Sequence, residues 1–115
     1  MAHVNVFVRP RPIEDPGVVP HIVSSQQAGN EVIVRLAKTE QSSEREFALD
    51  GFFDPLSTQD DVFAEIGEKT CTKVLSGFNS TVICFGPTAS GKSYTIFGSA
   101  EKPGLAPHII DYLFG

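Results

Sequence analysis

The chain alternates between short apolar runs and polar connections that contain proline, glycine and serine. Three of these runs predict strands, at residues 4–8, 31–37 and 45–50. The first two are rich in valine and isoleucine, and the third contains Phe47, Ala48 and Leu49. The long stretch 13–30 has only weak periodicity, and we expect it to be mostly loop. The polar stretch 38–44 is expected to join its two neighbouring strands as a hairpin connection.

The clearest helical pattern covers residues 58–76. Ser57, followed three residues later by Asp60, resembles a capping box, and Gly77 is placed to end the helix in a left-handed conformation. Mostly apolar residues at helical spacing predict the side of the helix that faces the core. They are Val62, Phe63, Ile66, Thr70, Val74 and Leu75.

An uninterrupted apolar run, Thr-Val-Ile-Cys-Phe, follows at residues 81–85. Its length and β-branched composition are typical of a strand that is buried on both faces of a parallel sheet. A helix, a buried strand and a glycine-rich turn in this order predict an α/β fold. After Pro107, the apolar spacing of residues 109–114 indicates the opening of a further helix.

The composition narrows the class of protein. The 115 residues are 41% apolar and 20% charged, which is typical of one globular domain. No apolar run approaches the roughly 18 residues that cross a bilayer, and the start lacks the features of a signal peptide. The net charge of −5 argues against binding to nucleic acid or to an anionic membrane. Cys71 and Cys84 match neither a redox pair nor a zinc pattern, so we expect reduced thiols in a cytosolic protein.

Directly after the expected strand at 81–85 the sequence reads G-x-x-x-x-G-K-S, the pattern of a phosphate-binding loop. The residues predicted to bind phosphate are Gly86, Pro87, Thr88, Ala89, Ser90, Gly91, Lys92 and Ser93. A glycine at each end lets the backbone turn tightly and approach a phosphate without a Cβ in the way. The amides from about residue 90 to 94 are then expected to face an anion at the start of a helix.

Two side chains of the loop have specific expected roles. Lys92 would place a positive charge on the β and γ phosphates, and Ser93 would offer its hydroxyl to Mg²⁺. Other chemistry has less support, because Ser90 and Ser93 lack the paired His and Asp of a hydrolase triad. The three histidines share no spacing of metal ligands. The loop pattern also allows another interpretation, an unrelated kinase or GTPase that has the same phosphate-binding loop.

Six segments, in collinear order, resemble motifs of the kinesin motor family. They are VRPRP at 8–12, FALDGFFD at 47–54, TQDDVF at 58–63, GFNSTV at 77–82, GPTASGKSYTI at 86–96 and GLAP at 104–107. The chain departs from the family pattern where Phe78, Ser80, Pro87 and Ile96 stand in place of Tyr, Gly, Gln and Met. One such match is weak evidence, whereas six in order indicate a divergent member of the family.

The resemblance implies a fold, a ligand and an activity. The fold is the α/β three-layer fold of P-loop NTPases, a central sheet with flanking helices plus a small β lobe, here incomplete. The ligand is ATP or ADP with Mg²⁺, and the activity is ATP hydrolysis coupled to movement along microtubules. The resemblance also implies that Arg9, Arg11 and Pro12 flank the adenine and ribose, with Tyr94 stacking on the other side. Proline, aromatic and guanidinium planes all suit an adenine face.

Kinesins carry two later switch motifs, N-x-x-S-S-R-S-H and D-x-x-G-S-E, and neither occurs in residues 1–115. The family's microtubule-contacting elements also lie downstream. We therefore expect the N-terminal part of a motor domain, with no catalytic residue within this chain and no turnover by the chain alone. Its expected location is the cytoplasm, on the cytoskeleton. The alternative is a non-motile module, truncated or degenerate, that binds nucleotide or a partner.

Overall fold

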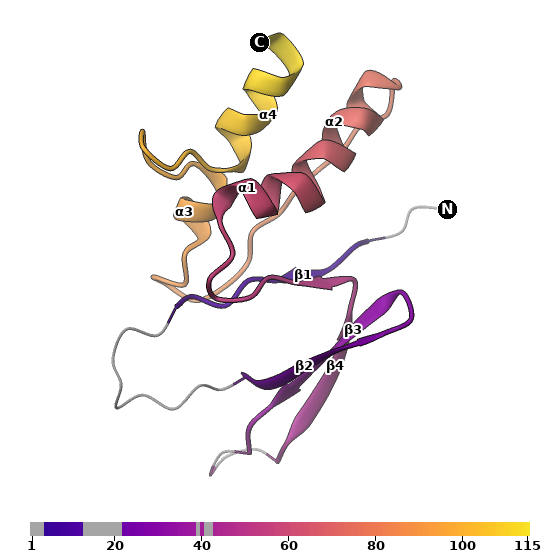
Figure 1. Cartoon of the computed structure of the whole chain (residues 1–115), viewed down its shortest axis with the longest axis vertical. Coiled ribbons are helices and arrows are strands. Elements are labelled where there is room, and N and C mark those ends of the chain that lie inside the picture. Colours follow the sequence, from indigo (N-terminus) through magenta and orange to yellow (C-terminus); the bar gives the residue numbers. More distant parts are fainter. Residues whose placement is uncertain (1–3, 13–21, 39, 41–42) are drawn as a thin grey trace. The chain divides into compact units, whose positions relative to one another are not determined.

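The computed structural model describes residues 4–12, 22–38, 40 and 43–115. The chain divides into two compact units, Met1–Leu56 and Ser57–Gly115. Strands make up the regular structure of the first unit and helices that of the second (Figure 1). The predicted mixture of strands and helices is therefore present, but within the described residues the two kinds of element are segregated instead of alternating.

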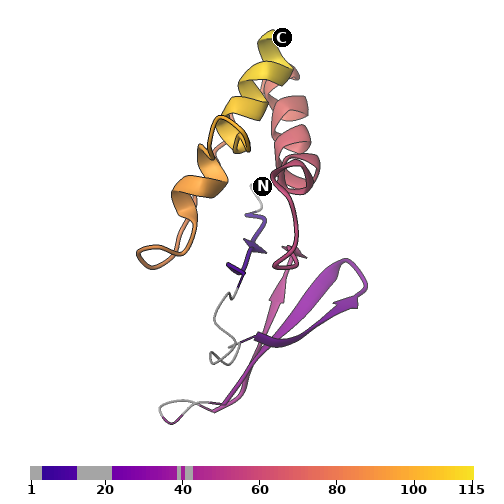
Figure 2. The ribbon, with the colours of Figure 1, turned by 60° about the vertical axis from the view of Figure 1, so that its left-hand side comes forward.

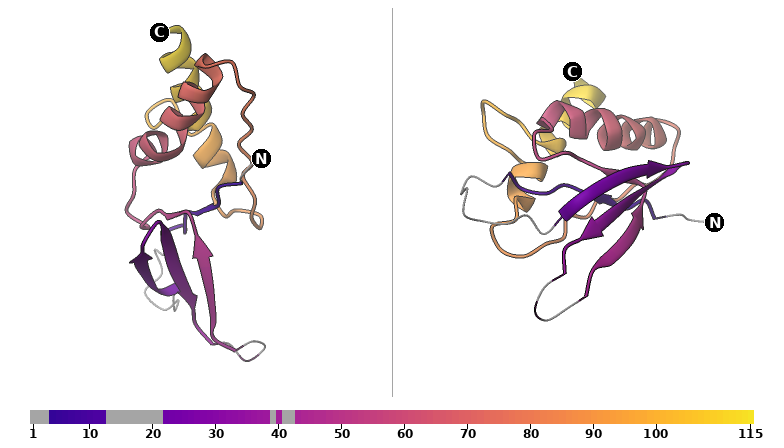
Figure 3. Two further views of the ribbon diagram at one scale, coloured as in Figure 1. Left: turned by 90° about the vertical axis from the view of Figure 1, so that its right-hand side faces the viewer. Right: turned by 60° about the horizontal axis from the view of Figure 1, so that its bottom comes forward.

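The larger sheet of the first unit is antiparallel, with the strand order β2-β3-β4 (Figure 3, right). Its strands are β2 (Ile22–Ala28), β3 (Glu31–Leu36) and β4 (Arg45–Leu49). The strands predicted at 31–37 and 45–50 are confirmed to within one residue. Val34, in the middle of β3, is buried, so the central strand supplies the sheet's contribution to the core.

Strand β2 lies in the stretch that was predicted to be mostly loop, and for residues 22–28 that prediction is wrong. Most of β2 is exposed and polar, so backbone hydrogen bonds to β3, and not side-chain burial, hold it in place. Gly29 has a φ of +64°, and Ala28 lies opposite Glu31. Gly29 and Asn30 thus form a two-residue hairpin turn, and this Gly-Asn pair was the signal in the sequence. Residues 13–21 of the predicted loop lie outside the described residues.

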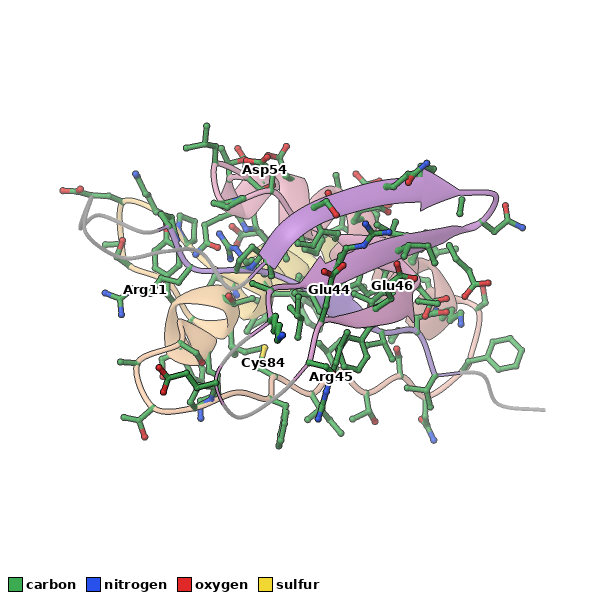
Figure 4. The ribbon with its side chains drawn as sticks, turned by 90° about the horizontal axis from the view of Figure 1, so that it is seen from below. Arg11, Glu44, Arg45, Glu46, Asp54 and Cys84 are labelled. Carbon is green, nitrogen blue, oxygen red and sulfur yellow. The ribbon has the colours of Figure 1, made fainter. Side chains whose placement is uncertain are left out.

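Charged side chains pair across β3 and β4. Arg35 lies opposite Glu46, and its Nη2 donates to Oε1 of Glu46 at 2.6 Å. Its Nε lies 3.4 Å from Oε1 of Glu44, and both glutamates are labelled in Figure 4. All three side chains are about half exposed, so each pair stabilises the hairpin by no more than about 1 kcal/mol.

The second sheet is a short parallel pair of strands, β1 (Phe7–Val8) and β5 (Gly51–Phe52). The strand predicted at 4–8 is therefore confirmed only in its last two residues. The ring of Phe7 stacks on that of the buried Phe53, with centroids 5.9 Å apart. Aromatic packing thus supplements a ladder that contains few hydrogen bonds.

Three consecutive helical segments open the second unit: α1 (Gln59–Val62), η1 (Phe63–Gly67) and α2 (Glu68–Leu75). Together they confirm the helix predicted at 58–76 to within one residue at each end. The cap is Thr58 and not Ser57, because the Thr58 side chain accepts the Asp61 amide at 3.2 Å. The Asp61 carboxylate accepts the Thr58 amide at 2.8 Å, which completes a capping box one residue later than predicted. Gly77, with a φ of +94°, follows the helix in the predicted left-handed conformation.

The middle segment, η1, is a π-helical turn. The backbone N–H of Glu68 donates to the carbonyl of Phe63, five residues earlier. Gly67 is buried within this turn, and a Cβ at that position would lie only 2.2 Å from the ring of Phe63. The absence of a side chain at Gly67 therefore lets the Phe63 ring lie across the helix.

The core of the second unit forms where the last helix, α4 (Leu105–Phe114), runs alongside η1 and α2 (Figure 2). Its most deeply buried apolar residues are Val62, Cys71 and Leu105. Phe63 contacts His108 and Tyr112 of α4, with ring centroids 5.3 and 5.9 Å apart. Helix α4 starts two residues before Pro107, earlier than predicted, because proline is tolerated in a first helical turn. In the described part of the chain, no helix has the length and apolarity needed to cross a membrane.

The face predicted for the helix at 58–76 is only partly correct. Val62 is buried and Phe63, Ile66 and Thr70 are half-buried, but Val74 and Leu75 near the end of α2 are exposed. Cys71, which the pattern did not single out, takes a place in the core.

Residues 81–85 do not form the predicted buried strand. No described strand pairs with them, and Figure 3 (left) draws the chain after α2 as a thread without an arrow. Ile83 is 80% exposed and Phe85 is 98% exposed. The physical reason is that a strand needs neighbouring strands for its backbone hydrogen bonds, and the second unit supplies none among its described residues.

Neither cysteine forms a disulfide, and we expect the two thiols to differ in reactivity. Burial, and next the negative charge of Glu68, raise the pKa of the Cys71 thiol, so less of it is thiolate at a given pH. Cys84, which is labelled in Figure 4, is only half-buried. Iodoacetamide at pH 8 should therefore alkylate Cys84 well before Cys71, as measured by peptide mass spectrometry. In denaturant the two rates should become similar, and faster alkylation of Cys71 in the folded chain would contradict this assignment.

Candidate functional site

The predicted phosphate loop connects the extended residues 81–85 to helix α3 (Lys92–Ile96). The amide of Ser90 donates to the carbonyl of Pro87 at 3.2 Å, which closes a tight turn inside the loop. Ala89 has a φ of +64° and Gly91 a φ of +103°, so the backbone is left-handed at both positions. Gly91, at the N-cap of α3, has the residue type that this conformation favours.

The side chain of Lys92 folds back over the loop. Its Nζ donates to the carbonyl oxygen of Gly86 at 2.7 Å, so the ammonium group lies at the loop's first residue. Gly86 itself packs closely, because a Cβ there would lie 2.6 Å from Oγ of Ser90. Ser93, the next residue of α3, is exposed. The two groups predicted to meet phosphate and Mg²⁺ thus both come from the first turn of α3.

Helix α3 is tied to the start of α4 by a short connection. Gly98 and Pro103 form an isolated antiparallel bridge, and the Gly104 amide donates to the carbonyl of Phe97 at 2.9 Å. A Cβ at Gly104 would lie 2.7 Å from the carbonyl oxygens of both Thr95 and Ile96. The backbones of α3 and α4 therefore approach each other more closely than a side chain at Gly104 would allow.

The first turn of α1 contacts both of these elements. Gln59 is buried, and its Nε2 donates to the Tyr94 carbonyl at 2.7 Å and lies 3.4 Å from the Lys102 carbonyl. Asp60 pairs with His108 of α4, with Oδ1 3.2 Å from Nε2. The other ring nitrogen of His108 lies 3.0 Å from the Gly104 carbonyl. Sequence reasoning did not identify the contacts of Gln59 and Asp60, because their partners lie 35 or more residues away in the chain.

The residues expected around the base lie in different units. Arg9, Arg11 and Pro12 follow β1 in the first unit, where Arg9 is half-buried and the other two are exposed. Figure 4 shows the Arg11 side chain extending from the ribbon. Tyr94 lies on α3 in the second unit and is 41% exposed. That these four side chains meet around one adenine stays a prediction.

The described residues contain no group of three or more His, Cys, Asp or Glu side chains that could hold a metal ion by themselves. Ser93 accordingly stays the predicted protein contact for Mg²⁺, together with the phosphates that would supply further oxygen ligands. Of the histidines, His3 and His21 lie outside the described residues, and His108 makes the contacts given above.

Comparison with known proteins decides the family. Residues 9–115 match the kinesin motor domain. The chain belongs to the kinesin family. Among its relatives, this kinesin chain is 34% identical over 112 residues to the kinesin-like protein KIN-14T of Arabidopsis thaliana. It is 28% identical over 119 residues to the kinesin heavy chain of Drosophila melanogaster.

Solved kinesin structures match as well. The motor domain of the Kar3-like kinesin from Ashbya gossypii superimposes with a TM-score of 0.82 at 25% identity, over 98% of this chain. KIF14 with ADP, in complex with a microtubule, matches with a TM-score of 0.76 at 25% identity. These matches give the kinesin chain the P-loop NTPase fold of the motor domain.

The matches cover nearly all of this chain but only part of each relative. The kinesin chain spans 36% of the Ashbya gossypii motor chain and 33% of the KIF14 chain. It spans 12% of KIN-14T and 11% of the Drosophila heavy chain. The activity and partners of complete motor proteins are therefore proposals for this chain.

Proposed function

We propose that residues 86–93 bind the phosphates of ATP or ADP together with Mg²⁺. The observation that carries this proposal is the position of Lys92, whose ammonium group lies 2.7 Å from the carbonyl of Gly86 and therefore over the loop. A phosphate bound in the loop would replace that carbonyl as the partner of the ammonium group. Its negative charge would make the new contact stronger than the present one.

Each part of the loop has a role in this proposal. The left-handed Gly91 starts α3, whose first amides have no carbonyl one turn earlier to bond and can bond a phosphate oxygen. Ser93 would hold Mg²⁺ through its hydroxyl, and bound Mg²⁺ would neutralise charge on the phosphates. Arg9, Arg11, Pro12 and Tyr94 would contact the adenine and ribose.

We further propose that the chain is the N-terminal, nucleotide-binding part of a kinesin-like microtubule motor that acts on the cytoskeleton in the cytoplasm. Support comes from the family match over residues 9–115 and from the relative that was solved with ADP on a microtubule. ATP hydrolysis would then need the switch motifs of a complete motor domain, and the 115 residues alone would not turn nucleotide over. Microtubule contact would likewise come from outside these residues.

Thermal unfolding of the full-length protein with and without Mg-ADP tests nucleotide binding. A ligand that binds only the folded state at a hundredfold excess over its Kd raises the free energy of unfolding by about 2.7 kcal/mol. We expect such an increase with Mg-ADP and a smaller one when EDTA removes the metal. Unchanged unfolding at millimolar Mg-ADP would count against nucleotide binding.

Ser93→Ala tests the metal contact separately. Removing the hydroxyl should abolish most of the difference between Mg-ADP and ADP with EDTA, while binding of metal-free ADP changes little. Ser25→Ala is the matched control, because Ser25 is exposed in β2 and is not part of the loop. Nucleotide binding without microtubule-stimulated hydrolysis in the full-length protein would favour the alternative, a non-motile binding module.

A further inference from the structure

Among the residues that the structure describes, Gln59 is the one buried polar residue, and 7% of its surface is exposed. Its amide group donates to the Tyr94 carbonyl at 2.7 Å, and the Lys102 carbonyl lies 3.4 Å away. A buried amide without acceptors is costly, so these two carbonyls account for a polar side chain at this place.

The Tyr94 carbonyl belongs to the C-terminal turn of α3. Carbonyls in the last turn of a helix have no amide one turn later to bond, and they need partners from elsewhere. The Ser93 carbonyl accepts the amides of Phe97 and Gly98, at 2.8 and 3.1 Å. Gln59 supplies a donor to the carbonyl that follows, and thereby connects the end of α3 to another helix.

Gln59 is itself held in place. It is the first residue of α1, directly after the Thr58 cap, whose side chain and backbone both bond to Asp61. Helix α3, by contrast, has only five residues, far fewer than a helix needs to be stable by its own hydrogen bonds. The position of α3 therefore depends on the contacts at its ends, and Gln59 of α1 supplies one of them beside the backbone connection to α4.

We propose that Gln59 is a positioning residue for phosphate binding, which holds α3 so that Lys92 and Ser93 lie correctly in the loop. This inference rests on the proposed function of residues 86–93. Lys92 and Ser93 directly precede Tyr94 on α3, so a displacement of the Tyr94 carbonyl displaces both. A misplacement of about 1 Å at a binding group can cost two orders of magnitude in activity.

The test compares Gln59→Met with the wild type in the full-length protein. Methionine has nearly the same length and volume but no donor. Calorimetric titration should show about tenfold weaker binding of Mg-ADP, because without this hydrogen bond α3 would be correctly placed in only about a tenth of the molecules. Hydrogen exchange, measured by mass spectrometry without nucleotide, should become faster in residues 92–98 and stay unchanged in residues 68–75.

Val62→Ala is the matched control, since Val62 is 2% exposed in the same helix and makes no hydrogen bond to α3 through its side chain. It should lower the melting temperature yet leave the Mg-ADP affinity unchanged well below that temperature. Equal affinities for wild type and Gln59→Met, or unchanged exchange in residues 92–98, would overturn the proposal. If the wild type binds no Mg-ADP, the proposed function fails, and the exchange of residues 92–98 still decides the role of Gln59.

Discussion

Replacing Lys92 with alanine is expected to weaken Mg-ATP and Mg-ADP binding about a hundredfold and to bring ATP turnover of the full-length protein to background. The ammonium group lies 2.7 Å from the Gly86 carbonyl, so it is placed over the loop before nucleotide arrives. Its charge would stabilise phosphate oxygens on which negative charge builds up, and loss of one such donor costs about 10²–10³ in rate. Nucleotide titration and a steady-state phosphate-release assay measure both effects.

Lys73→Ala is the control for this substitution. Lys73 also lies in the second unit and is exposed in the last turn of α2, so its removal changes the net charge equally without touching the loop. We expect its binding and turnover to match the wild type. An unchanged ATPase in Lys92→Ala would refute the assignment of the phosphate loop.

The second large effect concerns residues 81–85, whose apolar side chains are mostly exposed in the 115-residue chain. We expect these 115 residues alone to be marginally stable, because sheet-forming residues without neighbours contribute little burial. Scanning calorimetry should show no sharp transition above about 50 °C. Binding of a dye that fluoresces on apolar surfaces should be strong. A cooperative melt well above that temperature would contradict this expectation.

Ile83→Asp tests whether residues 81–85 are exposed in the 115-residue chain but buried in a complete motor domain. Ile83 is 80% exposed here, so aspartate should change the stability of the 115 residues by less than about 0.5 kcal/mol. In a complete motor domain we expect the segment to be a buried strand, where an unpaired carboxylate would prevent folding. Leu56→Asp, in a turn where Leu56 is 87% exposed, should be tolerated in both settings. Soluble yield and melting temperature measure the difference, and equal tolerance in both settings would show that the segment is not a buried strand.

The elements whose own residues carry the sequence signal for their structure were predicted well. Strand β3 has β-branched residues and β4 has a short apolar run, and the helix at 58–76 has both a cap and a glycine stop. Strand β2 was missed because its residues are polar and its hydrogen bonds depend on β3. The segment 81–85 was predicted as a strand for the opposite reason, since its composition is right but the described residues offer it no partner.

The candidate site likewise has a part that the sequence predicts and a part that only the structure shows. The order of residues in the loop 86–93 is a local property, and the sequence alone indicates its chemistry. Gln59 could not be identified in this manner, because a glutamine after a helix cap is unremarkable until its acceptors at Tyr94 and Lys102 are known. Contacts between residues far apart in the chain follow from packing, which a local pattern does not contain.

The π turn at Phe63–Gly67 also determines how the length of this helix can change during evolution. The bond from the Glu68 amide to the Phe63 carbonyl encloses one residue more than an α-helical turn does. Removal of one residue within the turn could therefore restore regular α-helical hydrogen bonds and leave α2 close to its present orientation relative to α1. Removal of one residue from the regular part of the helix before Cys71 would instead rotate the residues that follow by about 100°. Cys71 would then leave the core while Gln59 kept its contacts with α3, so we expect a one-residue deletion to be tolerated best within the π turn.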